Sequence, residues 1–319
     1  MLPDRLKLVN LGSPFNQLQG LSCDPLPDKK LAGVSFLHLC EGAKLHIISQ
    51  INCKKLVVTV DNLAARATYN KLSSYEDQKC AYLPAKDEVL VPRRNLSSAN
   101  DVERIAGLSK FCNGDIDTLV ISVESLFQRF PKQELVKKYS VSLSVNDEIE
   151  PNELARRLGV AGYVRQEVVG DPGEFAQRGD IFDICTIDDV VYRIGFFDDL
   201  VEEIRVLDKT NITTVDHVDS ILVYPTSDYL FDENGLELAR TELLKHKDID
   251  KALDVLSMLN LGANRTNIVW GLPYFKESTV NILEYFLNNN PSLVIFDEPK
   301  LIYDKLEILN KEFNSRIKS

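Results

Sequence analysis

The chain has 319 residues, of which 44% are hydrophobic and 27% charged, the balance of a soluble globular protein long enough for two or three compact units. Its formal net charge of −11 argues against a general nucleic-acid binder, because non-specific affinity for polyanions comes from basic surface. No apolar run approaches the length of a membrane span, the start lacks the pattern of a signal peptide, and six cysteines form no C-x-x-C pair. We therefore expect a cytoplasmic protein with free thiols.

The first part of the chain is predicted to form a parallel α/β lobe. KKLVVTV (54–60) and DTLVISV (117–123) are short apolar runs, typical of parallel strands that are covered on both faces. After the first run, Asp61 is expected to cap a helix whose apolar stripe includes Leu63 and Leu72. The alternation of strand and helix predicts a parallel sheet with right-handed crossovers.

A change of composition after this lobe predicts a small β-rich insertion. The insertion is expected to begin with a helix that starts at Pro151 and ends just before Gly159. Beyond it the pattern returns to helices, and the apolar run PSLVIF (291–296) would suit the sheet of the first lobe. The fold class is therefore α/β: one parallel lobe in two parts, interrupted by a β-rich domain. The predicted boundaries are 1–136, 137–222 and 223–319.

The segment from 173 to 208 is the most informative part of the insertion. It is predicted to hold three short antiparallel strands, with one face buried and one in water. After the Gly179 turn, Phe182 and Ile184 share one face while Ile181 and Asp183 share the other. The segment has no nucleophile–base pair and no metal-ligand spacing, which favours a surface that another protein grips. Its arginines are Arg178, Arg193 and Arg205.

Three ordered motifs in this segment carry a family resemblance. They read G-E-F-A-x-R-G-x-I-x-D-I, then Y-R-I-x-F-F-D, then E-x-I-R-x-L-D. They resemble the UvrB-like module of bacterial nucleotide excision repair, and more closely the N-terminal region of transcription-repair coupling factors (Mfd). TLVISVESLFQRFP (118–131), LARRLGVAGYVRQEVV (154–169) and SLVIFDEP (292–299) follow the same order. The resemblance implies a degenerate helicase-like lobe whose β-rich insertion docks UvrA.

The resemblance also implies which residues carry the contact. Arg165 in GYVRQEVV and Arg178 in FAQRGD occupy two arginine positions of the family motif, whereas Ala176 stands where UvrB has a further arginine. Arg suits such a role because its planar fork can grip carboxylates in a bidentate manner. Phe175, Phe182 and Arg193 complete the predicted partner-binding set.

A structural role for the two main arginines stays open at this point. Arg165 and Arg178 could instead form internal salt bridges with neighbouring carboxylates, and exposed pairs of this kind contribute little stability. The candidate partners are Glu167, Glu174 and Asp180.

The nucleotide site of a helicase lobe is expected to be degenerate. A phosphate loop requires G-x-x-x-x-G-K-[ST], but HLCEGAKL has His38, Ala43 and Leu45 at the two glycine positions and the hydroxyl position. Lys44 is then expected to be ordinary helix surface, and VIFDEP, which resembles a Walker B strand, has no phosphate loop to serve. We expect no cofactor, no metal and no enzymatic activity in this chain, with ATP used only at a C-terminal motor of the parent protein.

The DNA-clamping hairpin of UvrB has no clear counterpart. The corresponding stretch, LPAKDEVLVPRRNLSSAN (83–100), contains no aromatic residue for stacking on bases, which favours the coupling factor. The resemblance implies UvrA as the partner, with RNA polymerase and DNA reached through the parent, and a contact with a C-terminal domain that masks the docking surface. Two alternatives stay open: a UvrB-like ATP-dependent DNA helicase subunit with a working nucleotide site, and an α/β module that binds a small metabolite.

Overall fold

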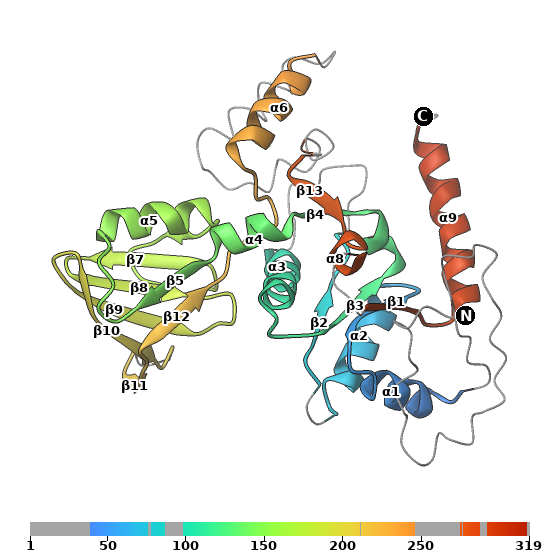
Figure 1. Ribbon diagram of the computed structural model, residues 1–319, viewed down its shortest axis with the longest axis horizontal. Coiled ribbons are helices and arrows are strands. Elements are labelled where there is room, and N and C mark those ends of the chain that lie inside the picture. The colour runs from blue at the N-terminus through green and yellow to red at the C-terminus, as the bar shows by residue number, and fades with distance from the viewer. Residues whose placement is uncertain are drawn as a thin grey trace. The chain divides into compact units, whose positions relative to one another are not determined.

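The computed structural model forms two compact units (Figure 1). It describes residues 39–75, 78–86, 98–210, 212–245, 275, 277–287 and 292–317. The first unit comprises Met1–Ala81, Ile116–Val123 and Tyr285–Ser319, and the second comprises Tyr82–Asp115 and Glu124–Glu284.

A parallel sheet forms the centre of the first unit. Strand β1 (Lys54–Thr59) pairs in parallel with both β3 (Thr118–Ser122) and β14 (Ser292–Phe296). The sheet order is β14-β1-β3-β2, where β2 is Cys80–Leu83. Consecutive apolar residues of β1 and β3 are fully buried, as expected of strands that are covered on both faces. The predicted parallel strands are confirmed, including the return of the last strand to the first sheet.

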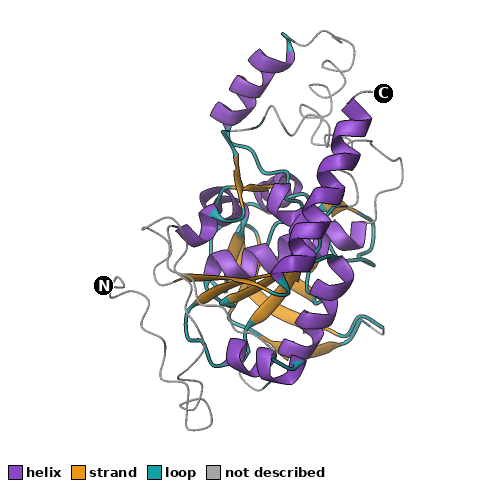
Figure 2. Ribbon diagram, turned by 90° about the vertical axis from the view of Figure 1, so that its right-hand side faces the viewer, coloured by secondary structure: helices purple, strands orange, loops and turns teal. Residues whose placement is uncertain are grey.

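Three helices accompany this sheet, α1 (Glu41–Ser49), α2 (Asn62–Leu72) and α9 (Pro299–Ile317), which Figure 2 shows in purple. The side chain of Asp61 accepts a hydrogen bond from the backbone N–H of Ala64 at 2.8 Å, so the predicted cap of α2 is confirmed. The predicted apolar stripe was right for Leu72, which is 1% exposed, but wrong for Leu63, which is 80% exposed. The buried positions are Ala65, Thr68 and Leu72, since small side chains let the helix approach β1 and β3 closely.

A six-stranded sheet dominates the second unit. Its order is β11-β10-β9-β8-β7-β6; strands β7 to β11 are consecutive and antiparallel, and β6 is parallel to β7. The segment 173–208 contains four strands rather than the predicted three, because the turn at Gly179 (φ 58°) already follows a strand, β7. The six strands of the whole sheet are β6 (Val164–Arg165), β7 (Glu174–Arg178), β8 (Ile181–Cys185), β9 (Val191–Phe197), β10 (Leu200–Leu207) and β11 (Thr214–His217).

One face of this sheet, here called the core face, packs against helix α5 (Pro151–Val160) and a two-stranded sheet of β5 (Val141–Ser144) and β12 (Ser220–Val223) (Figure 1). Their shared cluster includes Leu154, Leu158, Phe175, Phe182, Ile184, Ile194 and Ile204, all at most 4% exposed. The other face, here called the open face, carries none of this cluster.

The end of α5 differs from the sequence-based expectation. Gly159 lies inside the helix, and the residue that ends it is Gly162, whose φ of +99° is unfavourable for any other residue. The N–H of Tyr163 donates to the carbonyl of Leu158 at 2.9 Å, the long-range bond of a Schellman ending.

The remaining elements of the second unit are mostly helical, as expected, with one exception. The helical pattern expected after the insertion includes residues 279–289, but Thr279–Asn281 forms a strand, β13, that pairs antiparallel with β4. The helix expected at 248–259 lies outside the described residues. These elements are α3 (Ser98–Asn113), the 3₁₀ helix η2 (Val123–Phe127), β4 (Arg129–Pro131), α4 (Gln133–Tyr139), α6 (Glu233–Leu243) and β13. Helix α8 (Glu284–Leu287) begins at the last residue of the second unit and otherwise belongs to the first.

Among the helices that the structure describes, none combines the length and apolar character needed to cross a bilayer.

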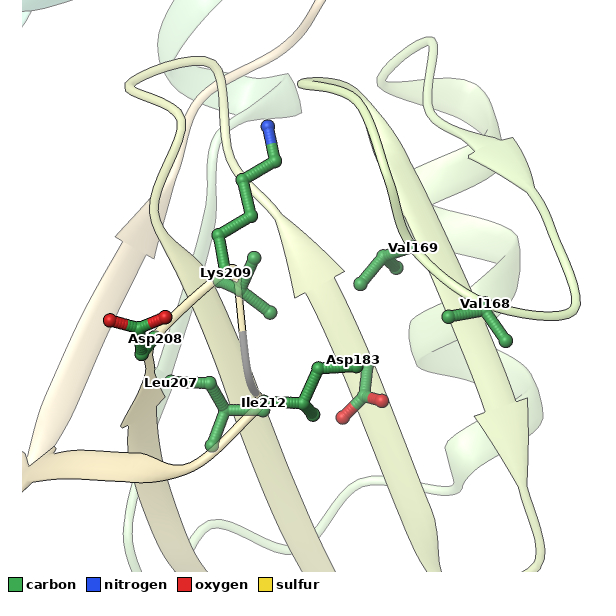
Figure 3. A pocket seen from close by; sticks show the side chains of 8 residues that line it. Val168, Val169, Asp183, Leu207, Asp208, Lys209 and Ile212 are labelled. Carbon is green, nitrogen blue, oxygen red and sulfur yellow. The ribbon is translucent and has the colours of Figure 1, made fainter.

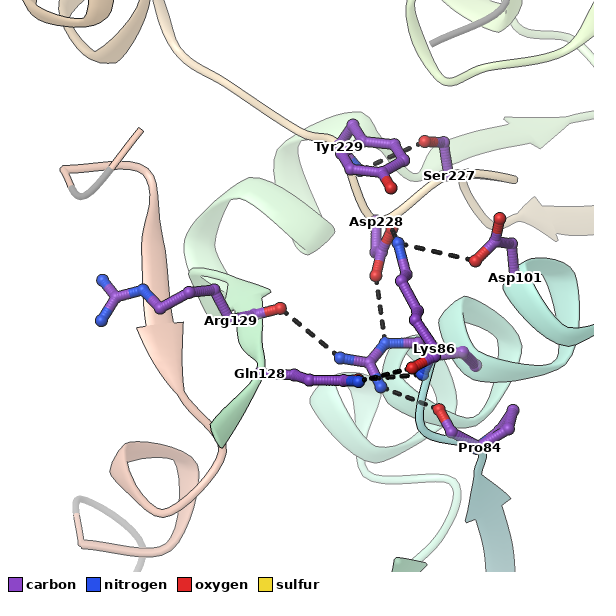
Figure 4. Close-up of polar contacts among 9 residues, drawn as sticks. Pro84, Lys86, Asp101, Gln128, Arg129, Ser227, Asp228 and Tyr229 are labelled. Carbon is purple, nitrogen blue, oxygen red and sulfur yellow. Dashed lines mark hydrogen bonds and ion pairs between the residues drawn. The ribbon is translucent and has the colours of Figure 1, made fainter. Parts of the chain in front are cut away.

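A buried ion network holds distant segments of the second unit together (Figure 4). The Nε of Arg104, on α3, donates to Oδ2 of Asp228 at 3.1 Å, and Lys86 Nζ donates to Oδ1 at 2.6 Å. The guanidinium of Arg104 also lies over the ring of Phe130, 3.8 Å from its centroid. Arg104 is 1% exposed and Asp228 5%, so neither charge has water as an alternative partner.

We predict that Asp228→Asn destabilises the second unit strongly. Removing one partner of a buried ion pair leaves uncompensated charge and costs about 3–5 kcal/mol. Urea denaturation followed by circular dichroism measures the loss. The exposed pair partner Glu153, on α5, supplies the matched control, since Glu153→Gln is expected to leave the midpoint unchanged. Equal midpoints for the two variants would contradict the prediction.

The same network predicts acid sensitivity. Burial alone would raise the pKa of Asp228, but the attraction of Lys86 and Arg104 outweighs it and holds this pKa below its ordinary value of 3.8. A lowered carboxyl pKa contributes stability that is present above the ordinary value and is lost as the pH falls through the folded-state value. We expect this contribution to decline as the pH falls below about 4, to be lost once the pH has fallen through the folded-state value, and to be missing from the acid titration of Asp228→Asn.

Candidate functional site

A row of polar and charged side chains crosses the open face of the six-stranded sheet. The strand registers pair Ala176 with Asp183, Asp183 with Arg193, Arg193 with Arg205, and Arg205 with His217. Residues that are directly opposite one another in neighbouring strands point to the same side of a sheet. The row therefore runs from β7 to β11 on the open face.

Asp183 is the centre of an ion cluster in this row. Its carboxylate is buried, at 2% exposed, and accepts hydrogen bonds from two arginines. Arg193 grips both oxygens, with Nε at 2.7 Å from Oδ1 and Nη2 at 2.8 Å from Oδ2. Arg178 Nη2 donates to Oδ2 at 2.7 Å. The bond to Asp183 outweighs partial burial and raises the pKa of Arg193 above its ordinary value.

The two arginines of the cluster differ in how much of them is accessible. The side chain of Arg193 is 18% exposed, whereas that of Arg178 is 50% exposed. A guanidinium has five N–H donors, and Asp183 takes one from Arg178. Among the described residues, no other acceptor bonds this side chain. Arg178 therefore presents most of its hydrogen-bonding fork to solvent.

Arg165 lies apart from this cluster. It is exposed on β6, the edge strand of the sheet, and its guanidinium contacts no acceptor in the described part of the chain. The register pairs Arg165 with Phe175, whose side chain lies on the core face, while Arg178 lies on the open face. The structure thus leaves both arginines accessible but does not bring them onto one face of the sheet.

The internal salt bridges considered for these arginines are not the ones that form. Arg178 pairs with Asp183 rather than with Glu174 or Asp180, and Arg165 pairs with no carboxylate among the described residues.

Phe175 and Phe182 require a correction as partner-binding residues. They are 4% and 0% exposed and belong to the core cluster, where their rings stack with centroids 5.4 Å apart. Because Phe182 precedes Asp183 by one residue in β8, it points to the opposite side of the sheet. The two rings pack on the core face, on the opposite side of the sheet, and are not part of the surface of the open face.

Apolar side chains border the charged row at one end of the open face. A small pocket lies there, to which Figure 3 shows that the side chains of Val169 and Ile212 contribute. Its lining residues are Val168, Val169, Asp183, Val191, Leu207, Asp208, Lys209 and Ile212. Its volume, about 20 Å³, admits a water-sized group, so it offers little to a metabolite. The exposed apolar side chains on or beside the open face include Val164, Val168, Ile181, Phe197 and Ile212, at 37–68% exposure.

Glu174 holds one of these loops in place. Its Oε2 accepts hydrogen bonds from the backbone N–H groups of Gly170 at 2.8 Å and Asp171 at 2.9 Å, and its Oε1 accepts one from Gln166 at 3.1 Å. Partial burial would raise the pKa of Glu174, but these bonds outweigh it and lower that pKa. The glutamate of the G-E-F motif therefore shapes the apolar border of the site.

Sequence reasoning missed two contributors to this surface. It placed Asp183 on the face opposite Phe182 but gave it no role, although a carboxylate between two apolar strand residues signals a paired charge. It had no signal for Ile212, which adopts a left-handed φ of 58° in a loop.

The first unit contains the second candidate site from the sequence, the stretch around Lys44 that was compared with a nucleotide-binding loop. Lys44 Nζ donates to Asp297 Oδ1 at 2.7 Å and to Glu298 Oε1 at 3.0 Å. The prediction that Lys44 is ordinary helix surface was wrong, since only 25% of its side chain is exposed. Burial lowers the pKa of Lys44, but the two carboxylates outweigh it and raise that pKa. Within the described ranges, no cluster of His, Cys, Asp and Glu could hold a metal ion.

Comparisons with known proteins match this chain to DNA-repair proteins by name. A transcription-repair-coupling factor from Bacillus subtilis is 27% identical over 277 residues, which cover 81% of this chain and 23% of that protein. UvrABC system protein B from Thermotoga maritima is 29% identical over 209 residues, 61% of this chain and 31% of that protein. The Escherichia coli transcription-repair-coupling factor is 23% identical over 239 residues, 73% and 21% of the two chains. This chain spans less than a third of each relative.

A family model places the resemblance on the domain that carries the open face. Residues 141–229 match the family described as the UvrB interaction domain, a range that includes the six-stranded sheet, α5, β5 and β12. The expected resemblance is therefore confirmed: residues 141–229 match the UvrB interaction domain, within a chain similar to transcription-repair-coupling factors and to UvrABC system protein B.

Proposed function

We propose that this chain is the UvrA-recruiting module of a transcription-repair coupling factor and acts in transcription-coupled nucleotide excision repair. The observation that carries the proposal is the half-exposed fork of Arg178 on a domain that matches the UvrB interaction family. The family model supports a role in repair through protein contact, and the choice of UvrA as the partner rests on the motif resemblance.

The open face has the composition of a protein contact. Arginine is enriched among residues that dominate binding energy, and a fork with free donors can grip a partner carboxylate in a bidentate manner. The apolar border formed by Val168, Ile181 and Ile212 would exclude water around that contact. We propose Arg178 as the main anchor, with Arg193 behind it and Arg165 at the edge of the sheet as a separate contact.

We further propose that the first unit is a degenerate helicase-like lobe without ATPase activity. Its parallel sheet and the position of Lys44 beside Asp297 and Glu298 support this proposal. In a working site the lysine neutralises phosphates and the carboxylates serve Mg²⁺ and water. Here the lysine is already neutralised by the carboxylates, so a nucleotide would have to displace two ion pairs.

In the parent protein, RNA polymerase and DNA are proposed partners of other regions, and the cytoplasm is the proposed location. A contact between the docking surface and a C-terminal domain of the parent is part of the same proposal.

We predict that the purified chain neither binds nor hydrolyses ATP, with or without DNA. Isothermal calorimetry and a phosphate-release assay measure the two activities, and Lys44→Ala is the control for any residual signal. The competing function is a UvrB-like helicase subunit, favoured by the similarity to UvrABC system protein B. A DNA-stimulated ATPase that Lys44→Ala abolishes would establish that alternative.

We predict that the chain binds purified UvrA and that Arg178→Ala weakens binding about tenfold or more, because loss of an arginine anchor commonly costs over 1 kcal/mol. The double variant Arg165→Ala/Arg178→Ala is expected to lose about 2 kcal/mol or more. Calorimetry at moderate salt measures both affinities.

Arg156 offers a matched control for this experiment. It is an exposed arginine on α5 that, like Arg178, pairs with one carboxylate, Glu153 at 2.7 Å. Arg156→Ala is expected to bind UvrA like the wild type, with circular dichroism showing that every variant is folded. Absence of wild-type binding would remove the proposed function, and equal losses for Arg156→Ala and Arg178→Ala would remove the proposed site.

A further inference from the structure

We infer that Asp183 is a positioning residue of the docking surface, which aims the fork of Arg178 outward by fixing one of its ends. This inference rests on the proposed function. Asp183 itself is buried and would not touch the partner.

The arrangement of the cluster assigns each arginine a different task. Arg193 lies directly opposite Asp183 and covers both carboxylate oxygens, while its own side chain is mostly buried. Arg178 is a diagonal neighbour on β7 and reaches Oδ2 with Nη2 alone. One end of the Arg178 guanidinium is thereby fixed, and its other N–H groups make no hydrogen bond to Asp183.

The residue opposite Asp183 on β7 explains why Arg178 takes this place. The register pairs Asp183 with Ala176, which carries no polar group. The side of the carboxylate that faces β7 is therefore open to the next residue on the same face, two positions along the strand. Arg178 is that residue, so the small side chain of Ala176 makes room for the contact.

Burial makes the arrangement rigid. A carboxylate removed from water needs its charge compensated, so Asp183 holds both arginines more firmly than an exposed pair would. Arginine has many rotamers, and a partner that binds a free arginine must order it at an entropic cost. Fixing Nη2 in advance reduces that cost for Arg178.

Simple charge counting predicts the opposite behaviour. If the surface acted through net positive charge alone, removing a carboxylate beside two arginines would strengthen binding to an acidic partner. If Asp183 positions Arg178, the same change weakens binding. Asp183→Asn separates these readings because it keeps the size of the side chain and removes its charge.

The test measures UvrA binding by calorimetry for the wild-type chain, Asp183→Asn, Arg178→Ala and the combination of the two. We expect Asp183→Asn to weaken binding about tenfold, and to have no further effect in the Arg178→Ala background, because residues that act as one unit are not additive. Asp180→Asn is the matched control: Asp180 is exposed in the adjacent turn, and losing its charge is expected to change affinity by less than about twofold.

A second variant covers the case in which Asp183→Asn does not fold. Arg193→Lys keeps the charge on that side chain but loses the two-point grip on the carboxylate. It is expected to weaken binding about threefold, again only when Arg178 is present. NMR of the arginine Nε–H groups adds a readout without UvrA, since the protected Nε–H of Arg193 should become fast-exchanging in Asp183→Asn.

The outcomes separate the two proposals. If the wild-type chain does not bind UvrA, the proposed function fails. If Arg178→Ala weakens binding but folded Asp183→Asn binds as well as or better than the wild type, the positioning role fails alone. Full additivity of Asp183→Asn and Arg178→Ala would also overturn it, because Asp183 would then act on binding independently of the arginine.

Discussion

The side chains of β8 alternate between two environments, and the arrangement of the six-stranded sheet depends on this alternation. Phe182 and Ile184 belong to the hydrophobic cluster beneath the sheet, and Asp183 between them lies on the open face. A strand with period two must place a residue there, and a charge at that position is stable only with paired cations. The two arginines meet this requirement, so the packing of the core fixes the place of the surface charges.

Three of the ion clusters described above join cationic side chains to carboxylates, with different results. Arg104 and Lys86 surround Asp228 in the interior of the second unit, where the network joins distant segments. Lys44 forms ion pairs with Asp297 and Glu298 in the first unit. At Asp183 two arginines meet one buried carboxylate, which leaves one positive charge in excess. Glu153 on α5 is likewise shared by two arginines, Arg156 and Arg157, but its side chain is 34% exposed against 3% for Asp183.

Elements with a strong local signal could be predicted from the sequence. The apolar runs of β1, β3 and β14 and the cap at Asp61 were read correctly, because burial on both faces and capping depend on short-range pattern. The errors occur where tertiary contacts decide. Leu63 has the right spacing for a buried stripe, yet the small residues of α2 face the sheet. Arg178 was predicted from the family motif and Arg193 as a neighbour of it, whereas the carboxylate that holds both arginines needed the strand register.

The edge position of β6 has a geometric consequence for any partner of this domain. Arg165 and Arg178 lie on opposite sides of one sheet, and only β7 and β6 separate the open face from the rim. A single protein that contacts both arginines must therefore wrap around the edge strand β6, because a flat surface could reach only one side of the sheet. Such a partner would enclose the main chain of β6, and its own surface would have to be concave.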